Sequence, residues 1–464
     1  MGIKKLVENL LITDIADKGQ ALGKSGPTVV FVDKAIPGDV VDVMITRSRK
    51  NYMEGRVTAL KTPSELRATP FCSHFGLCGG CKWQDMQYPS QLHYKQKQVS
   101  DAMERIAKVN SLEILPIIAA PDTTYYRNKL EYTFSPKRWL TRDEMENPET
   151  VLPGFGFHMP GRFDKVLDIR HCYLQAEPSN SIRLSVKDFT MEKGYSYFDP
   201  VTQHGFLRNM IIRSSSSGEV MVIVVFHKYD KDKIDPLMDH IRESFPQVTS
   251  LLYVINEKKN DSVSDLPVTL YSGNPFITEK MEDLTFRIGA KSFYQTNATQ
   301  AYRLYCVTRE FAGLTGTETV YDLYTGTGTI ANFVASKAGK VIGVEYIPEA
   351  IADAFENSEV NGITNTAFFA GDMKAILTQE FFDKHGKPDV IIADPPRAGM
   401  EEKVVQSILS SGAGTIVYVS CNPATQARDM LLLSPVYEAI RSQPVDMFPH
   451  THHVENVVLL KRRS

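Results

Sequence analysis

The sequence predicts an α/β protein with three regions: a small N-terminal β-barrel, a β-rich central domain and a C-terminal Rossmann-like domain. From about residue 285, strand-like runs such as "DVIIA" and "GTIVYVS" alternate with helical stretches, the pattern of a doubly wound sheet. Short β-branched runs broken by "KSGP" and "IPGD" fill the first sixty residues, and runs such as "VMVIVVF" dominate 125–280. We expect boundaries at 1–62, 63–283 and 284–464.

The size and composition are those of a protein with ample core and no membrane span. The chain has 464 residues and a formal net charge of −3, so any nucleic-acid binding must come from local basic patches. No apolar run reaches the roughly 18 residues of a transmembrane helix. The N-terminal stretch lacks an apolar secretory segment followed by small residues, so we expect a cytoplasmic protein with no membrane partner.

Residues 1–62 suggest an OB-like barrel of five short strands, a common platform for oligonucleotides. Within 47–61 one acid, Glu54, stands among several basic residues: Arg47, Arg49, Lys50, Arg56 and Lys61. A solvated hairpin would explain these charges equally well. Beyond the linker "KTPSELRATPFC", residues 89–108 predict a helix, which could pack on the C-terminal domain.

Three cysteines lie within ten residues, in the spacing C-x5-C-x2-C. They are Cys72, Cys78 and Cys81, and "IRHCYL" adds Cys172 as a fourth. In a reducing compartment this grouping favours an iron–sulfur or zinc site over a disulfide framework. Cys306, inside a helical stretch, is interpreted as a core residue.

A glycine-rich turn follows the first strand of the C-terminal region. Asp322 ends that strand, Gly326 and Gly328 permit close backbone approach to a ligand, and the helix from Thr329 presents free N–H groups. Glu345 ends the next strand, placed to bond ribose hydroxyls. The same order continues with "AGD" at 370–372 and "DPPR" at 394–397.

This ordered set resembles class I S-adenosylmethionine-dependent methyltransferases. The resemblance implies that Asp322, Tyr324, Gly326 and Gly328 line the cofactor pocket, with Thr329 at the helix start. It also implies that Glu345 takes the ribose and that Asp372 faces the adenine amine. A helix cap before "MKAIL" is the alternative role for Asp372.

Cys421 lies in "VSCNPATQARD", at the carboxyl end of a buried strand, where open α/β sheets place their ligands. Methylation of pyrimidine carbon 5 needs a thiolate to add at carbon 6 and a base to remove the carbon-5 proton. Cys421 supplies the thiol, and its position between a strand end and a helix start is expected to favour the thiolate. Glu455, at the mouth of a C-terminal strand, is the candidate base. Arg397 follows "DPP" where amino methyltransferases carry an aromatic residue, which argues against exocyclic nitrogen chemistry.

Together "SCNPATQARD", "DPPRAG", "HVENV" and "KSFYQTN" resemble the RNA uracil-5-methyltransferases over nearly the whole chain. By this resemblance the barrel is a TRAM domain, Cys421 is the nucleophile and Glu455 the proton acceptor. Gln295 and Asp394 would lie in the shared cofactor and uracil pocket. Phe293 would stack on the base, Tyr294 would be packing or pocket wall, and Arg127, in the family motif "YRNK", would contact RNA. The resemblance also implies a [4Fe–4S] cluster on the four cysteines Cys72, Cys78, Cys81 and Cys172, whereas the spacing alone leaves zinc open.

The combination of barrel and cysteine cluster is most similar to the bacterial enzymes that act on 23S ribosomal RNA. The predicted function is therefore methylation of carbon 5 of a 23S rRNA uridine by a monomeric, S-adenosylmethionine-dependent enzyme. Two alternatives stay open: the same chemistry on the T-loop uridine of transfer RNA, and a non-catalytic RNA-binding or assembly protein.

Overall fold

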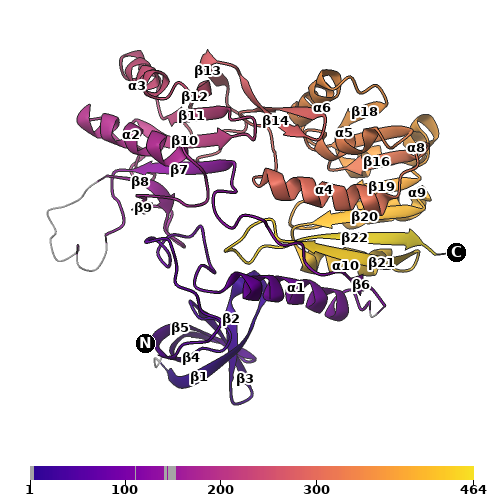
Figure 1. The fold of residues 1–464 in the computed structure, drawn as a ribbon, viewed down its shortest axis with the longest axis horizontal. Helices are drawn as coiled ribbons and strands as arrows, with labels where there is room; N and C mark the ends of the chain where they lie inside the picture. The colour runs from indigo at the N-terminus through magenta and orange to yellow at the C-terminus, as the bar shows by residue number, and fades with distance from the viewer. Residues whose placement is uncertain (1–4, 110, 141–143, 145–152, 464) are drawn as a thin grey trace.

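A computed structural model describes residues 5–109, 111–140, 144 and 153–463 (Figure 1). The N-terminal region forms a closed five-stranded barrel with the strand order β1-β2-β3-β5-β4. Its core consists of alternate β-branched residues, including Val30, Val32, Val41 and Val43. The elements are β1 (Leu6–Ile15), η1 (Asp17–Gly19), β2 (Ala21–Ser25), β3 (Thr28–Asp33), β4 (Val40–Ser48) and β5 (Tyr52–Thr62). The predicted barrel is thus confirmed.

The central region is built on a seven-stranded sheet with the order β13-β12-β11-β10-β7-β8-β9. Its strands are β7 (Lys129–Ser135), β8 (Gly154–His158), β9 (Val166–Asp168), β10 (Leu207–Ser214), β11 (Val220–Phe226), β12 (Val248–Ile255) and β13 (Val268–Gly273). Every residue of β11, "VMVIVVF", is buried, as expected of a strand covered on both faces. Helices α2 (Ser179–Glu192) and α3 (Lys231–Ser244) lie on one face, and the hairpin β14 (Phe276–Met281) and β15 (Leu284–Gly289) leads to the C-terminal region.

The C-terminal region is an eight-stranded sheet of order β18-β17-β16-β19-β20-β22-β21-β6. The strands β16 (Thr319–Leu323), β17 (Lys340–Glu345), β18 (Thr366–Ala370), β19 (Val390–Ala393) and β20 (Thr415–Ser420) are parallel. The strands β22 (Glu455–Arg462) and β21 (Tyr437–Val445) then add antiparallel. This sheet confirms the predicted doubly wound fold.

Two hydrophobic clusters cover the two faces of this sheet. One contains α4 (Ala298–Ala312), α5 (Thr329–Ala335) and α6 (Pro348–Val360), and it continues into the central sheet. The other contains α1 (Tyr88–Arg105), α7 (Met373–Ile376), α8 (Gln379–His385), α9 (Glu402–Ser411) and α10 (Pro423–Leu433).

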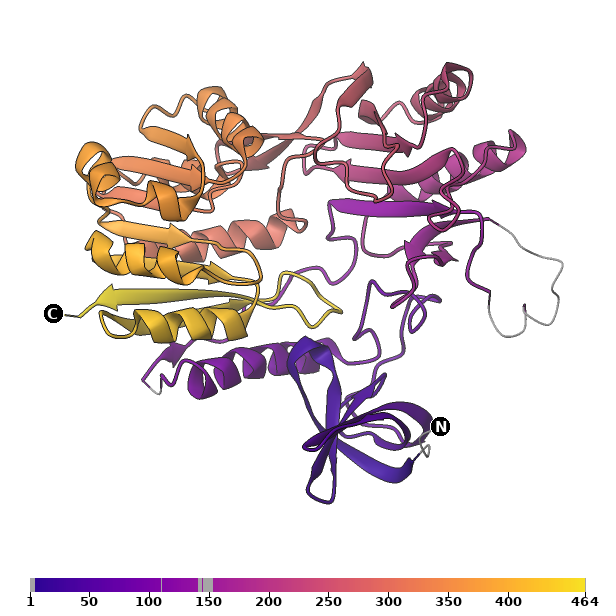
Figure 2. The ribbon, with the colours of Figure 1, turned by 180° about the vertical axis from the view of Figure 1, so that it is seen from behind.

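Helix α1 precedes the central sheet in the sequence but packs on the C-terminal sheet, beside α10 (Figures 1 and 2). The short strand β6 (Glu113–Ile114) extends that sheet by pairing in parallel with β21. At the core of the contact, Lys95 Nζ donates to Asp446 Oδ1 at 2.5 Å, and both side chains are fully buried. The segment from α1 to β6 therefore belongs to the C-terminal region, although it precedes the central sheet in the sequence.

The barrel also touches the C-terminal region. A Cβ atom built on Gly19, which has a φ of +71°, would lie 2.5 Å from Cβ of His452 and 3.3 Å from the Trp83 ring. Beside it, Lys82 Nζ donates to the carbonyl oxygen of Lys18 at 2.8 Å. The turn η1 therefore fits closely over residues 82–83 and 452.

Among the described residues, no helix combines the length and apolar character needed to cross a bilayer.

Candidate active site

Strand pairing brings Cys421 and Glu455 to the same edge of the sheet. In the antiparallel pair of β20 and β22, Ser420 lies opposite Asn456, so the residues just beyond each, Cys421 and Glu455, are neighbours. Asp394 follows β19, the other neighbour of β20, and its N–H donates to the carbonyl oxygen of Leu323 at 3.3 Å. One thiol and two carboxylates thus gather where the parallel strands end.

The turn after Cys421 is fixed to the "DPPR" turn. Asn422 caps α10 by accepting a hydrogen bond from the N–H of Ala424, and its amide donates to the carbonyl oxygen of Arg397 at 3.1 Å. Thr425 Oγ1 donates to the same oxygen at 3.2 Å. Asn422 and Thr425, which follow Cys421 in the sequence, therefore fix the backbone of the turn that carries Asp394 and Arg397.

Burial raises the pKa of all three groups. It raises the pKa of Cys421 to about 11; the Glu455 carboxylate raises it further, Arg397 lowers it, and Asp394 raises it by less. The pKa of Glu455 is raised to about 8 by burial and by Asp394, and that of Asp394 to about 7 by burial and by Asp322. The prediction that the strand–helix junction favours a thiolate is wrong for the protein alone, because desolvation outweighs the helix start.

The glycine-rich turn forms an open, polar cradle next to these groups. Asp322 is fully buried, and its Oδ2 accepts a hydrogen bond from Thr325 while its Oδ1 has no partner among the described residues. Glu345 ends β17, and its carboxylate accepts from the N–H groups of Gly326 (3.2 Å) and Ile347 (3.0 Å). A Cβ atom on Gly326 would meet nothing within 4 Å.

Further predicted residues complete this cradle. Tyr324 adopts a φ of +64°, Gly328 is the N-cap of α5 with a φ of +73°, and Thr329 is the first residue of that helix. An unpaired buried carboxylate oxygen beside open space over a glycine turn suits a cationic ligand with a polar tail. The residues present therefore fit S-adenosylmethionine.

Asp372 and Phe293 are two further residues predicted for the site. Asp372 caps α7 by accepting from the N–H of Lys374 at 3.2 Å, which is the alternative given for it above. Phe293 is 68% exposed, and its carbonyl oxygen accepts from Thr327 Oγ1 in the glycine-rich turn. It therefore adjoins the cradle with a free ring face.

Gln295 and Arg127 mark the side of the site that faces the central sheet. The carbonyl oxygen of Gln295 accepts from the Asn128 amide at 3.0 Å. The Arg127 guanidinium lies 5.5 Å from the ring centroid of Phe448, in the loop that leads to Glu455. The "YRNK" segment thus contacts both segments that enclose the site.

Two further residues, Gln426 and Tyr305, contribute to this arrangement and were not predicted from the sequence. Gln426 Nε2 donates to the carbonyl oxygens of Tyr418 (2.8 Å) and Asn456 (3.1 Å), and its Oε1 accepts from the Asn456 amide. Tyr305 of α4 is buried, and its pKa is raised by burial and by the charges of Asp394, Tyr294, Asp322 and Glu455 nearby. No local pattern distinguishes these residues, because each acts only through contacts distant in sequence.

The four clustered cysteines line one cavity of about 340 Å³. Cys172 is buried and Cys72, Cys78 and Cys81 are partly buried. Burial raises the pKa of Cys78 to about 11 and that of Cys81 to about 12. Within the described ranges, no three His, Cys, Asp or Glu side chains converge closely enough to hold a single metal ion. The four thiols therefore line a cavity and do not converge on the position of a single ion.

A doubly wound sheet with an acid–glycine cradle at its carboxyl edge is the arrangement of a domain that binds a nucleotide-containing cofactor. The sequence pattern of the family "tRNA (Uracil-5-)-methyltransferase" matches residues 212–463, and that of the TRAM domain matches residues 7–58. A protein of Porphyromonas gingivalis named as an uncharacterized RNA methyltransferase is 55% identical over 98% of this chain and 99% of its own. One of Bacteroides thetaiotaomicron with the same name is 55% identical over 97% of this chain and 100% of its own.

The solved structures add a similar protein with a bound cofactor product. The Pyrococcus abyssi tRNA (uracil-54, C5)-methyltransferase in complex with S-adenosyl-L-homocysteine is 27% identical, with a TM-score of 0.75 over 98% of this chain and 100% of its own. The chain belongs to the tRNA (uracil-5-)-methyltransferase family. It is an S-adenosylmethionine-dependent RNA methyltransferase with an N-terminal TRAM domain.

Proposed function

We propose that this enzyme methylates carbon 5 of a uridine in 23S ribosomal RNA through a covalent bond between Cys421 and carbon 6. The observation that carries the proposal is the pairing of β20 with β22, which sets a thiol beside a buried carboxylate. Such chemistry requires one nucleophile and one proton acceptor at the same base.

The steps assign one role to each group. Cys421, after losing its proton to water, adds to carbon 6, and the electron pair of the carbon 5–carbon 6 double bond becomes available at carbon 5. S-adenosylmethionine supplies the methyl group that carbon 5 takes up. Glu455 then accepts the carbon-5 proton, the double bond re-forms, and the Cys421 sulfur leaves.

The other site residues have supporting roles in this proposal. Asp322, Tyr324, Gly326, Gly328, Thr329, Glu345 and Gln295 hold the cofactor, and Asp372, whose Oδ1 caps α7, faces the adenine amine with its other carboxylate oxygen. Asp394 lies between cofactor and uracil, Phe293 stacks on the base, and Arg127 contacts the RNA. Because a base inside a duplex is inaccessible, the target uridine must be unstacked before Cys421 can reach it.

We further propose that the cysteine cavity holds a [4Fe–4S] cluster on Cys72, Cys78, Cys81 and Cys172, with zinc as the alternative. Four thiols around a cavity of about 340 Å³ support a cluster, since zinc would need all four sulfurs about 2.3 Å from one ion. Methyl transfer needs no electron, so the cluster's contribution is to order the segments that carry the cysteines.

Transfer RNA is the second candidate substrate. The names of the matching family and of the Pyrococcus abyssi enzyme both specify transfer RNA, whereas the Porphyromonas and Bacteroides relatives are named only for RNA. In both cases we expect a monomer with the same chemistry.

The test is incubation with S-adenosylmethionine labelled on its methyl group, with unmodified 23S rRNA and unmodified transfer RNA offered separately. Label in 5-methyluridine from 23S rRNA alone supports the proposal, and label from transfer RNA alone moves the same mechanism to the second substrate. The Cys421→Ala variant should lose all turnover while it still binds cofactor. If the wild type labels neither RNA and Cys421→Ala binds RNA as well as the wild type, the non-catalytic RNA-binding alternative is favoured.

A further inference from the structure

A group of four aromatic side chains lies at the surface beside the cysteine cavity. Tyr173 is at its centre, with ring centroids 4.4 Å from His171, 5.2 Å from Phe71 and 6.1 Å from Tyr125. Tyr125 Oη and His171 Nε2 are 3.2 Å apart. Phe71 is 40% exposed and Tyr125 45% exposed. Single exposed aromatic residues are ordinary, but a contiguous group of this kind indicates a binding surface.

The cysteine segments supply most of this aromatic group. Phe71 directly precedes Cys72, and His171 and Tyr173 flank Cys172. The segment with Tyr125 is held to them by two backbone hydrogen bonds of 2.7 Å, from Tyr125 N–H to Tyr173 and from Arg127 N–H to Leu174. Tyr125 also has a φ of +56°, an unfavourable value for a tyrosine, which indicates that the surroundings fix it.

The aromatic group is continuous with the loop that leads to Glu455. The ring of Phe71 lies 5.2 Å from that of His450, edge to face. Tyr126 Oη donates to the carbonyl oxygen of Pro449 at 3.0 Å, and Arg127 covers Phe448. A nucleotide close along the chain from a uridine bound at Cys421 would therefore pass this surface.

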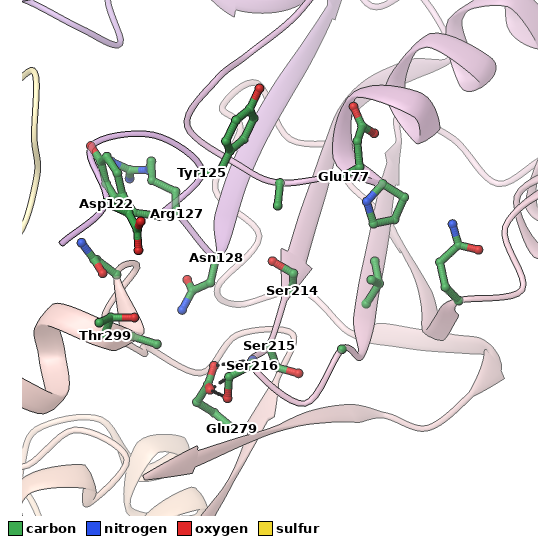
Figure 3. A pocket seen from close by; sticks show the side chains of 18 of the residues that line it. Asp122, Tyr125, Arg127, Asn128, Glu177, Ser214, Ser215, Ser216, Glu279 and Thr299 are labelled. Atoms are coloured by element: carbon green, nitrogen blue, oxygen red, sulfur yellow. Dashed lines mark hydrogen bonds between the residues drawn. The ribbon is translucent and has the colours of Figure 1, made fainter. Parts of the chain in front are cut away.

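A polar cavity of about 370 Å³ adjoins Tyr125 and Arg127, which both line it (Figure 3). The side chains of Asn128, Ser214 and Ser215 line it together with three carboxylates, those of Asp122, Glu177 and Glu279, and the Nε of Arg127 has no hydrogen-bond partner among the described residues. Hydroxyl, amide and guanidinium groups beside an aromatic face contact the sugar of a stacked nucleotide, and carboxylates accept hydrogen bonds from its hydroxyls but repel a phosphate.

We propose that Phe71, Tyr125, His171 and Tyr173 form a stacking subsite for an unpaired RNA base near the target uridine, with its ribose over the polar cavity. The inference rests on the RNA-methylating function proposed above. In this arrangement the cysteine site holds three of the four rings in place, because each is the direct chain neighbour of a cysteine.

Photo-crosslinking and binding test this proposal without using activity. Unmodified 23S rRNA and unmodified transfer RNA, both transcribed in vitro, are the probes. Ultraviolet irradiation of the complex should give base adducts on peptides that contain Phe71, Tyr125 or Tyr173. Adducts found only elsewhere would overturn the subsite.

The same two RNAs are then titrated against variants. Tyr125→Leu and Tyr173→Leu should each raise the Kd for RNA by about 5- to 100-fold, the effect of losing one base stack. Tyr125→Phe, which keeps the ring, should stay within about twofold of the wild-type Kd. Tyr229→Leu, at a tyrosine that is 62% exposed and outside the group, is the matched control.

Unchanged cofactor affinity shows that each variant is folded. If both leucine variants bind RNA as tightly as the wild type, the subsite is refuted. If they lose RNA binding while the wild-type enzyme places no label in 5-methyluridine, the subsite stands and the proposed function fails.

Discussion

Replacing Lys95 with Met should destabilise the protein strongly and slow catalysis. Lys95 and Asp446 are both fully buried, and among the described residues Asp446 would keep only the hydroxyl of Tyr88 (2.9 Å) and the N–H of Phe448 (3.1 Å) as donors. Removing one partner of a buried ion pair leaves an uncompensated charge and costs about 3–5 kcal/mol. Lys95 also donates to the carbonyl oxygen of Phe448 at 3.0 Å, so the loop that leads to Glu455 loses a second restraint.

Urea unfolding followed by circular dichroism measures the change, with labelled methyl transfer as the activity readout. Lys97→Met is the control on the same helix: Lys97 is 32% exposed and pairs with Asp14 and Asp101, so its loss should cost less than about 1 kcal/mol. Adding Asp446→Leu to Lys95→Met should recover most of the stability, because no charge is then left buried. Equal unfolding midpoints for the two lysine variants would refute this reasoning.

Three further predictions concern the buried acids. Glu455→Gln cannot accept the carbon-5 proton, so an RNA adduct on Cys421 should accumulate as a slow band on denaturing gels; no band in this variant would contradict its role. Because the pKa of Glu455 is raised to about 8, single-turnover methyl transfer should rise between about pH 7 and 9, and a flat profile would count against Glu455 as the base. The folded-state pKa of Asp394, about 7, lies above its ordinary value of 3.8, so stability falls as pH rises from about 4 to 7. Asp394→Asn should therefore raise the unfolding free energy at pH 8 by up to about 4 kcal/mol while activity is lost, and a lower unfolding free energy would refute this.

Much of the fold could be predicted because it depends on local sequence patterns. Alternating strands and helices after residue 285 predicted the doubly wound sheet, and short strands with turn residues predicted the barrel. The predicted enzyme class is confirmed by the family match, while the roles of Cys421 and Glu455 stay predictions.

What could not be predicted depends on contacts between distant segments. The position of α1 on the C-terminal sheet requires Lys95 to meet Asp446, 351 residues further along the chain. The raised pKa of Cys421 depends on how deeply the thiol is buried, which a strand–helix junction does not reveal. Gln426 is an ordinary polar helix residue until β22 brings Asn456 to it.

The close fit of Gly19 over His452 has a consequence for how the protein can be divided. The barrel packs on the rest of the chain through this contact. Removing residues 1–62 would therefore also expose Trp83 and the loop before Glu455, which carries His452. Loss of activity in such a truncation would not distinguish lost RNA binding by the barrel from a disturbed loop before Glu455. Exchanging the barrel for that of a relative would keep the loop intact only where the incoming turn also has a glycine at the position of Gly19.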